Sequence, residues 1–232
     1  MEEFILKDGS ITKDRRLDRI PQSDERSKMY RVTAMTTERQ PINKIHLCTT
    51  FLDQGTEGAC PGFGCSHALL AEPKQIKRQI VTAKFARETV YWGAQKIDPW
   101  PGGSYPGADP FYEGSSVLAA VQVLLKLGFI NGYYHAFSFT DLVIGVCYVG
   151  PPVVGVNWYT GMQEVDKDGF IHVTGELVGG HCLIISGINW FEEYFLLHNS
   201  WGKRWGIQGQ AKISFVDVAK LMNQHGDFIF FS

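Results

Sequence analysis

The sequence predicts an α+β protein with a helical first lobe and a strand-rich second lobe. Between about residues 50 and 135, apolar residues recur mostly at three- and four-residue spacings, the period of an amphipathic helix. After residue 150, short apolar runs alternate with turn-rich connectors, which is typical of strands. The length of 232 residues and the 44% hydrophobic content allow a sizeable core, in one large domain or two lobes. A run of helices followed by a run of strands indicates the α+β class.

Two segments of the first half are predicted to be helical. Residues 75–95 show the helical period of apolar residues. Residues 115–129 begin with a serine cap and approach their end at Gly128, a favoured C-terminal stop. Residues 97–114 lie between them and are too rich in glycine and proline to be regular, which predicts a long functional loop.

The second half reads as five strands and one short helix. The predicted strands are residues 151–158, 181–189, 193–199, 210–215 and 227–231, with a short helix at 216–222. Residues 1–45 differ from the rest because they are charge-rich and have few apolar clusters. That segment is predicted to be an arm or a wrap on the surface.

Charge and composition exclude several classes of protein. A formal net charge of -2 gives no basic face for nucleic acid or an anionic membrane. No apolar run reaches the roughly 18 residues needed to span a bilayer, and the N-terminus lacks the order of a secretion signal. The five cysteines are an odd, scattered set, which predicts free thiols. We therefore expect an intracellular, cytoplasmic protein.

Cys60 is the candidate nucleophile. Pro61 follows it and suits the first position of a helix, where its missing N–H would be unpaired anyway. A cysteine at a helix N-terminus faces the positive end of the macrodipole, which favours the thiolate and lowers the thiol pKa below about 8.5. Such a nucleophile also needs a base, and that base needs an orienting partner.

Downstream residues can fill these roles. His181 opens a predicted strand after a pair of glycines that leave room for a substrate, and Asn199 ends the next strand. The asparagine amide could accept a hydrogen bond from the imidazole and so fix its tautomer. The Gln54 amide and the backbone N–H of Cys60 could together donate hydrogen bonds to an oxyanion.

These residues resemble the papain-like cysteine peptidases. The segment DQGTEGAC resembles the family's Gln-Gly-x-Cys-Gly-Ser-Cys segment, GGHCLIISGIN its histidine strand, and LLHNSWGKRWGIQGQAKIS its Asn-Ser-Trp-Gly-x-x-Trp-Gly segment. The resemblance begins near residue 50 and extends to residue 232. It implies the papain-like fold of two lobes with the active site between them: a helical lobe at about 50–135 and an antiparallel, β-barrel-like lobe at about 136–232.

The resemblance also implies roles for individual residues. Cys60 would be the nucleophile, His181 the general acid and base, Asn199 its orienter and Gln54 an oxyanion donor. The implied substrate-binding residues are Gly58, Ala59, Gly114, Ser115, Gly180 and Trp201. Residues 46–232 would form the catalytic domain, and residues 1–45 a short prosegment, as in compact bacterial and phage members of the family. The implied partner is a protein or peptide substrate, with the chain's own N-terminal segment as a second candidate, and no cofactor is expected.

Three departures from the family pattern have consequences. Glu57 stands where most members have a disulfide cysteine, and its carboxylate could favour basic or unusual substrates or tune the pKa of Cys60. Pro61 and Gly62 replace an aromatic and a small residue after the nucleophile. The leader is short, and its residues 17–30 are the candidate for the Asp-rich, Arg-containing stretch that compact members carry.

Several alternatives stay open. Cys60, Cys65 and His67 could bind zinc, but the pattern has no second half, so we expect no metal. Asp166 and Gly169 predict a hairpin turn rather than a calcium loop. Among functions, the competitors are an inactive papain-like binding or structural protein, for example a virion component, and an acyl-transferring thiol enzyme.

Overall fold

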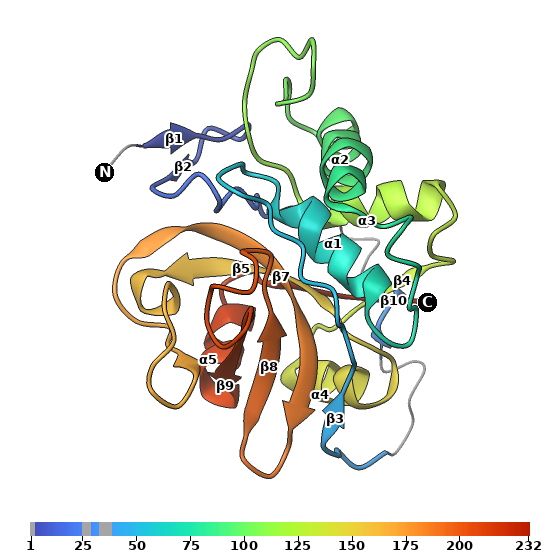
Figure 1. The fold of residues 1–232 in the computed structure, drawn as a ribbon, viewed down its shortest axis with the longest axis vertical. Helices are drawn as coiled ribbons and strands as arrows, with labels where there is room; N and C mark the ends of the chain where they lie inside the picture. Colours follow the sequence, from blue (N-terminus) through green and yellow to red (C-terminus); the bar gives the residue numbers. More distant parts are fainter. Residues whose placement is uncertain (1–2, 25–28, 33–38) are drawn as a thin grey trace.

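The computed structural model describes residues 3–24, 29–32 and 39–232. Figure 1 shows a group of helices packed beside a sheet, with the N-terminal residues in blue running between them. The helical group contains α1 (Cys60–Leu70), a π-helical segment (Phe85–Tyr91) continued by α2 (Trp92–Ile97), and α3 (Val117–Lys126). The α+β class is therefore confirmed.

Most of the strands belong to one eight-stranded sheet with the order β4-β10-β5-β7-β8-β9-β6, and β3 pairs with β7. In chain order the strands are β3 (Lys44–Ile45), β4 (Tyr133–His135), β5 (Val153–Tyr159), β6 (Phe170–Ile171), β7 (Leu177–Asn189), β8 (Tyr194–His198), β9 (Gln210–Ser214) and β10 (Asp227–Phe231). A small hairpin of β1 (Phe4–Ile5) and β2 (Ile11–Thr12) precedes them. Within the described residues the sheet does not close into a barrel.

Two helices differ from the prediction. The helix expected over 75–95 begins late, because Gln75 has a positive φ of 48° and the Thr82 hydroxyl accepts a hydrogen bond from the backbone N–H of Phe85, where the π-helical segment starts. Helix α4 (Phe139–Tyr148) was not expected; a capping box between Ser138 and Asp141 starts it. The short helix predicted at 216–222 is present as α5 (Phe215–Met222). No helix in the described ranges is long and apolar enough to cross a membrane.

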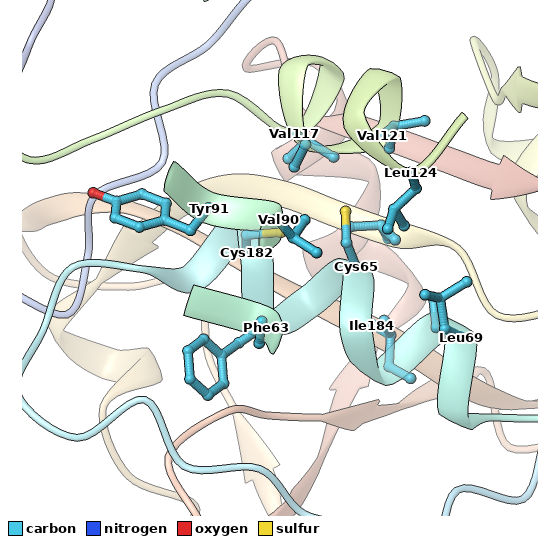
Figure 2. Packing of buried hydrophobic residues seen from close by; sticks show 14 of the residues in the cluster. Phe63, Cys65, Leu69, Val90, Tyr91, Val117, Val121, Leu124, Cys182 and Ile184 are labelled. Atoms are coloured by element: carbon cyan, nitrogen blue, oxygen red, sulfur yellow. The ribbon is translucent and has the colours of Figure 1, made fainter. Parts of the chain in front are cut away.

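Helix α1 is the centre of the packing. All of its residues are buried, between β7 on one side and the other helices of the first lobe on the other. Figure 2 shows its side chains meeting those of α3 and β7 in one apolar cluster. The helix approaches the sheet closely at Gly64, where an added Cβ would lie 2.7 Å from the Cys182 sulfur. This contact fixes the start of α1 against β7, the strand that carries His181.

Candidate active site

Cys60 is the first residue of α1, and Pro61 occupies the first turn, as predicted. Its thiol is completely buried and donates a hydrogen bond to Oδ1 of Asp18, with 2.9 Å between sulfur and oxygen. The same Asp18 oxygen accepts the backbone N–H of Cys60 at 3.3 Å. A carboxyl group from the N-terminal segment thus caps both the side chain and the amide of the candidate nucleophile.

His181 and Asn199 are joined as the sequence predicts. The histidine lies on β7, and its Nε2 is 2.7 Å from Oδ1 of Asn199, just beyond the end of β8. Because an amide oxygen only accepts, Nε2 carries the hydrogen, which leaves Nδ1 as the basic nitrogen. Nδ1 has no hydrogen-bond partner among the described residues. The Trp201 ring lies 4.6 Å from the imidazole, centroid to centroid, and helps to bury it.

Gln54 is buried beside these groups. Its Oε1 accepts a hydrogen bond of 2.6 Å from the Ser200 hydroxyl, which fixes the orientation of the amide. Its Nε2 donates to the backbone oxygens of Arg16, at 3.1 Å, and Glu57, at 2.9 Å. One donor hydrogen of the predicted oxyanion site is therefore bonded to the N-terminal segment.

The N-terminal segment lies along the site in extended pairing with both lobes. The N–H of Arg19 donates to the Gly180 oxygen at 3.0 Å, beside His181. On the other side, Ser115 donates to the oxygen of Asp18 at 3.3 Å and accepts from the N–H of Ile20 at 2.8 Å. We call residues 13–20 the covering segment, because Leu17, Asp18, Arg19 and Ile20 are buried and take part in burying the site.

The predicted substrate-binding glycines contact this segment. A Cβ on Gly180 would lie 2.1 Å from the oxygen of Arg19, one on Gly58 2.8 Å from the oxygen of Arg15, and one on Gly114 2.8 Å from Cδ1 of Ile20. Ala59, also predicted to bind substrate, is buried as the residue that precedes α1. Positions expected to hold a substrate backbone are thus positions where a peptide chain is held.

Burial sets the proton affinities in this covered state. It raises the pKa of Cys60 well above its usual value, with the negative charge of Asp18 as a second cause. It raises the pKa of Asp18 to about 7, partly offset by the hydrogen bonds from Cys60, and lowers the pKa of His181 to about 4. The expectation that the helix start lowers the thiol pKa is wrong for this state, because desolvation outweighs the helix dipole.

Other predicted features have simpler roles. The Glu57 carboxylate pairs with Arg87, so it is not free to act on Cys60. The five cysteines, all within the described ranges, are free and buried. His67 accepts the backbone N–H of Leu52 at 2.9 Å and packs against His198. Asp166 accepts two backbone N–H groups in the turn ending at Phe170, which is a hairpin-turn geometry.

Sequence reasoning missed Asp18 as a site residue. The only signal was its position in the Asp- and Arg-containing stretch at residues 17–30, of which 25–28 lie outside the described residues. Arg16 was missed too; its guanidinium carbon lies 4.1 Å from the Trp201 ring centroid. Neither residue belongs to a recognisable motif. Both lie near the site only because the covering segment runs along it.

Comparison with known proteins agrees with this architecture. Xylellain, a cysteine protease from Xylella fastidiosa, superimposes with a TM-score of 0.69 over 95% of this chain and 97% of its own, at 17% identity. The digestive procathepsin L 3 of Tenebrio molitor gives a TM-score of 0.54 over 95% and 75% of the two chains, at 13% identity. Bromelain from Ananas comosus, in complex with the E64 inhibitor, gives 0.51 over 80% and 94%, at 16% identity. The chain therefore has the papain-like fold.

Sequence relatives match shorter parts of the chain. Cathepsin B-like protease 1 of Arabidopsis thaliana is 26% identical over 131 residues, which are 51% of this chain and 35% of the relative. An uncharacterized peptidase C1-like protein of Acanthamoeba polyphaga mimivirus is 32% identical over 60 residues, 25% of this chain and 19% of the relative. No protein-family model matches the chain. The match thus spans about a third or less of these relatives, and it confirms the resemblance to papain-like cysteine peptidases.

Proposed function

We propose that the chain is a cysteine peptidase held in a latent form by its own N-terminal segment. The observation that carries the proposal is the bond between His181 of β7 and Asn199, just beyond the end of β8, together with Cys60 at the start of α1, the helix that packs on β7. Residues 46–232 are the catalytic domain in this proposal, and residues 1–45 supply the cover. Self-cleavage near residues 20–45 would fit this proposal, and that range lies partly outside the described residues.

The proposed reaction proceeds through a thioester. His181 Nδ1 takes the thiol proton as the Cys60 sulfur attacks the substrate carbonyl carbon, and the oxyanion accepts hydrogen bonds from Gln54 Nε2 and the N–H of Cys60. His181 then gives its proton to the leaving amine as the carbon–nitrogen bond breaks. Water attacks the thioester with His181 as base, which releases the acid and restores the thiol. Asn199 keeps the imidazole oriented throughout.

In the covered state each part of this machinery has another partner. The Asp18 carboxyl group accepts hydrogen bonds from the thiol and the backbone N–H of Cys60. The Arg16 carbonyl oxygen accepts a hydrogen bond from the Gln54 side-chain amide. Nδ1 of His181 accepts no hydrogen bond from the thiol in this state, because the thiol donates to Asp18. The proposal therefore requires the covering segment to leave before a substrate binds.

The experiment is alkylation of the purified full-length chain with E-64 and iodoacetamide across pH, read by intact mass. Bromelain is known in complex with this inhibitor. We expect slow labelling of the covered chain, and fast labelling confined to Cys60 once Asp18→Ala loosens the cover. Cys60→Ala removes the labelled site, and His181→Ala tests the base. Labelling of the loosened chain with the pH profile of an ordinary thiol, unaffected by His181→Ala, would contradict the proposal.

The raised pKa of Cys60 also favours a second candidate, an inactive papain-like binding protein in which the cover is permanent. The same alkylation series separates the two, because a permanent cover leaves Cys60 unreactive in every folded variant. If peptide bonds are processed, mass spectrometry of the products separates hydrolysis from acyl transfer to an amine.

A further inference from the structure

The covering segment inserts one side chain deep into the sheet. The Arg19 side chain is fully buried, and its Nη2 donates to Oδ2 of Asp227 at 2.6 Å and to the backbone oxygen of His225 at 2.9 Å. Nε approaches the same Asp227 oxygen at 3.2 Å. We call the space filled by this guanidinium the Arg19 pocket.

The pocket is formed mainly by residues of the sheet and not by the covering segment. Asp227 begins β10 and pairs with Gly155 of β5, which in turn pairs with Cys182 of β7. A Cβ on Gly155 would lie 2.8 Å from Nε of Arg19 and 2.6 Å from Cγ2 of Val117. The missing side chain at Gly155 therefore leaves the passage that leads from the level of His181 to the Asp227 carboxylate.

The pocket lies where a bound peptide would place a side chain. Arg19 follows Asp18, which contacts Cys60, and its own N–H bonds to the Gly180 oxygen next to His181. Any peptide that replaces the covering segment meets the same backbone groups of Gly180 and Ser115. One of its side chains will then point toward Asp227.

The negative charge of the Asp227 carboxylate, at the inner end of the Arg19 pocket, decides which side chain fits. Among the described residues, Arg19 is the only ion-pair partner of Asp227, so the carboxylate loses its counter-ion when the segment leaves. The Asp227 side chain is 14% exposed, and a carboxylate this far withdrawn from water is costly without a cation, which favours ligands that bring one. Nη1 of Arg19 has no partner among the described residues, and Nε and Nη2 both approach the same Asp227 oxygen, so the contact is not the two-oxygen pairing that only a guanidinium can make. Either cation, arginine or lysine, can therefore neutralise the Asp227 carboxylate.

We propose that the Arg19 pocket binds a lysine or arginine side chain of the peptide substrate, and that Asp227 is the residue that selects it. This rests on the proposed peptidase function and names its substrate class. The acidic residue that favours basic substrates is thus Asp227, whereas Glu57 is paired with Arg87.

The first test is substrate profiling of the full-length chain with Asp18→Ala and Arg19→Ala, which removes the carboxyl group that contacts Cys60 and the guanidinium that fills the Arg19 pocket. The chain is incubated with a mixture of synthetic peptides, and mass spectrometry identifies the cleaved bonds. We expect lysine and arginine to be enriched over norleucine, roughly tenfold to a hundredfold, at one fixed position from the cleaved bond. Adding Asp227→Asn should abolish the enrichment, and adding Asp168→Asn, which removes an exposed charge, should not. Cleavage without that enrichment, or enrichment that survives Asp227→Asn, would overturn the proposal.

A binding test separates this inference from the peptidase proposal. A fluorescein-labelled peptide of residues 13–24 is titrated with the same chain carrying Cys60→Ala, and a second peptide has citrulline at the position of Arg19. Fluorescence anisotropy should show binding of the arginine peptide that is at least roughly tenfold tighter, with the difference lost in Asp227→Asn. Equal binding of the two peptides, or binding of neither, would overturn the pocket assignment. A clear difference in binding without any cleavage would leave the pocket standing and refute the peptidase function.

Discussion

Oδ1 of Asp18 lies 2.9 Å from the sulfur of Cys60 and 3.3 Å from its backbone nitrogen. One oxygen atom thereby accepts both hydrogens that a reaction at Cys60 would use, the thiol proton and the amide proton aimed at an oxyanion. The thiol hydrogen therefore points to Asp18, and Nδ1 of His181 has no hydrogen-bond partner among the described residues. A single side chain can thus silence the proposed site while every residue of the site stays in place.

Replacement of Asp18 by alanine should uncover Cys60. The variant loses the two hydrogen bonds to Cys60 and opens a space at the thiol, so we expect iodoacetamide to label Cys60 at least roughly tenfold faster at pH 7. Intact mass over time gives the rate. Asp8→Ala is the matched control, because Asp8 precedes the covering segment and its exposed carboxylate accepts hydrogen bonds only from Ser10 among the described residues. Equal labelling rates in Asp18→Ala and the native chain would show that the carboxyl group is not what protects the thiol.

Replacement of Asn199 by alanine should slow acylation without removing the nucleophile. In the Asp18→Ala background the imidazole would lose the 2.7 Å bond that fixes its tautomer, and we expect the rate of substrate cleavage to fall on the order of tenfold to a hundredfold. Asn199→Asp keeps an acceptor oxygen and should retain more activity than the alanine variant. The measurement is kcat and KM for one peptide substrate. An effect on KM alone would assign Asn199 to binding instead of orientation.

The residues of the candidate site were predictable where a local sequence motif determines the helix or strand that carries them. Pro61 indicates the helix start at Cys60, and the strands that carry His181 and Asn199 are visible as apolar runs after turn residues. Their meeting in space followed from the family resemblance, since spacing alone does not place two strands beside a helix. The structure then supplied the contact geometry.

The buried contacts of the covering segment, and the helix α4, were not predictable for physical reasons. Asp18 contacts a residue 42 positions away, and its charge-rich surroundings show no apolar period that would indicate burial. Helix α4 is buried at every residue from Asp141 to Cys147, so this stretch has no polar face and lacks a clear helical period. Arg19 is the sharpest case: a charged residue in an apparent surface arm is fully buried because Asp227 receives it.

Gly64 should be essential for packing α1 on β7. An added Cβ would lie 2.7 Å from the Cys182 sulfur and 3.3 Å from the backbone nitrogen of Leu183, so we expect Gly64→Ala to lower the free energy of unfolding by about 1–3 kcal/mol. Removing the sulfur by Cys182→Ala should restore part of this loss, giving a favourable coupling in a double-mutant cycle. Urea unfolding followed by circular dichroism measures all four chains. Strict additivity of the two changes would mean that the contact with Cys182 is not the source of the strain.

The pH dependence of stability should reveal the opposite titrations of Asp18 and His181. Burial raises the pKa of Asp18 from 3.8 to about 7, so its contribution to stability is complete below pH 3.8 and is lost as pH rises toward 7. Burial lowers the pKa of His181 from 6.5 to about 4, so its contribution is present above pH 6.5 and is lost as pH falls toward 4. Between pH 4 and 6.5 the two trends oppose each other.

Asp18→Asn removes one of these opposing trends. Relative to the native chain, the variant should become more stable as pH rises through this window, by roughly 1.4 kcal/mol per pH unit at most. His181→Gln should show the reverse trend relative to the native chain, because only the Asp18 titration then remains at the site. Other buried histidines, such as His198 with its pKa lowered to about 4, titrate alike in all three chains and cancel in the differences. Urea unfolding at pH 4.5, 5.5 and 6.5 gives these differences, and parallel curves for the three chains would refute the coupled burial of the two groups.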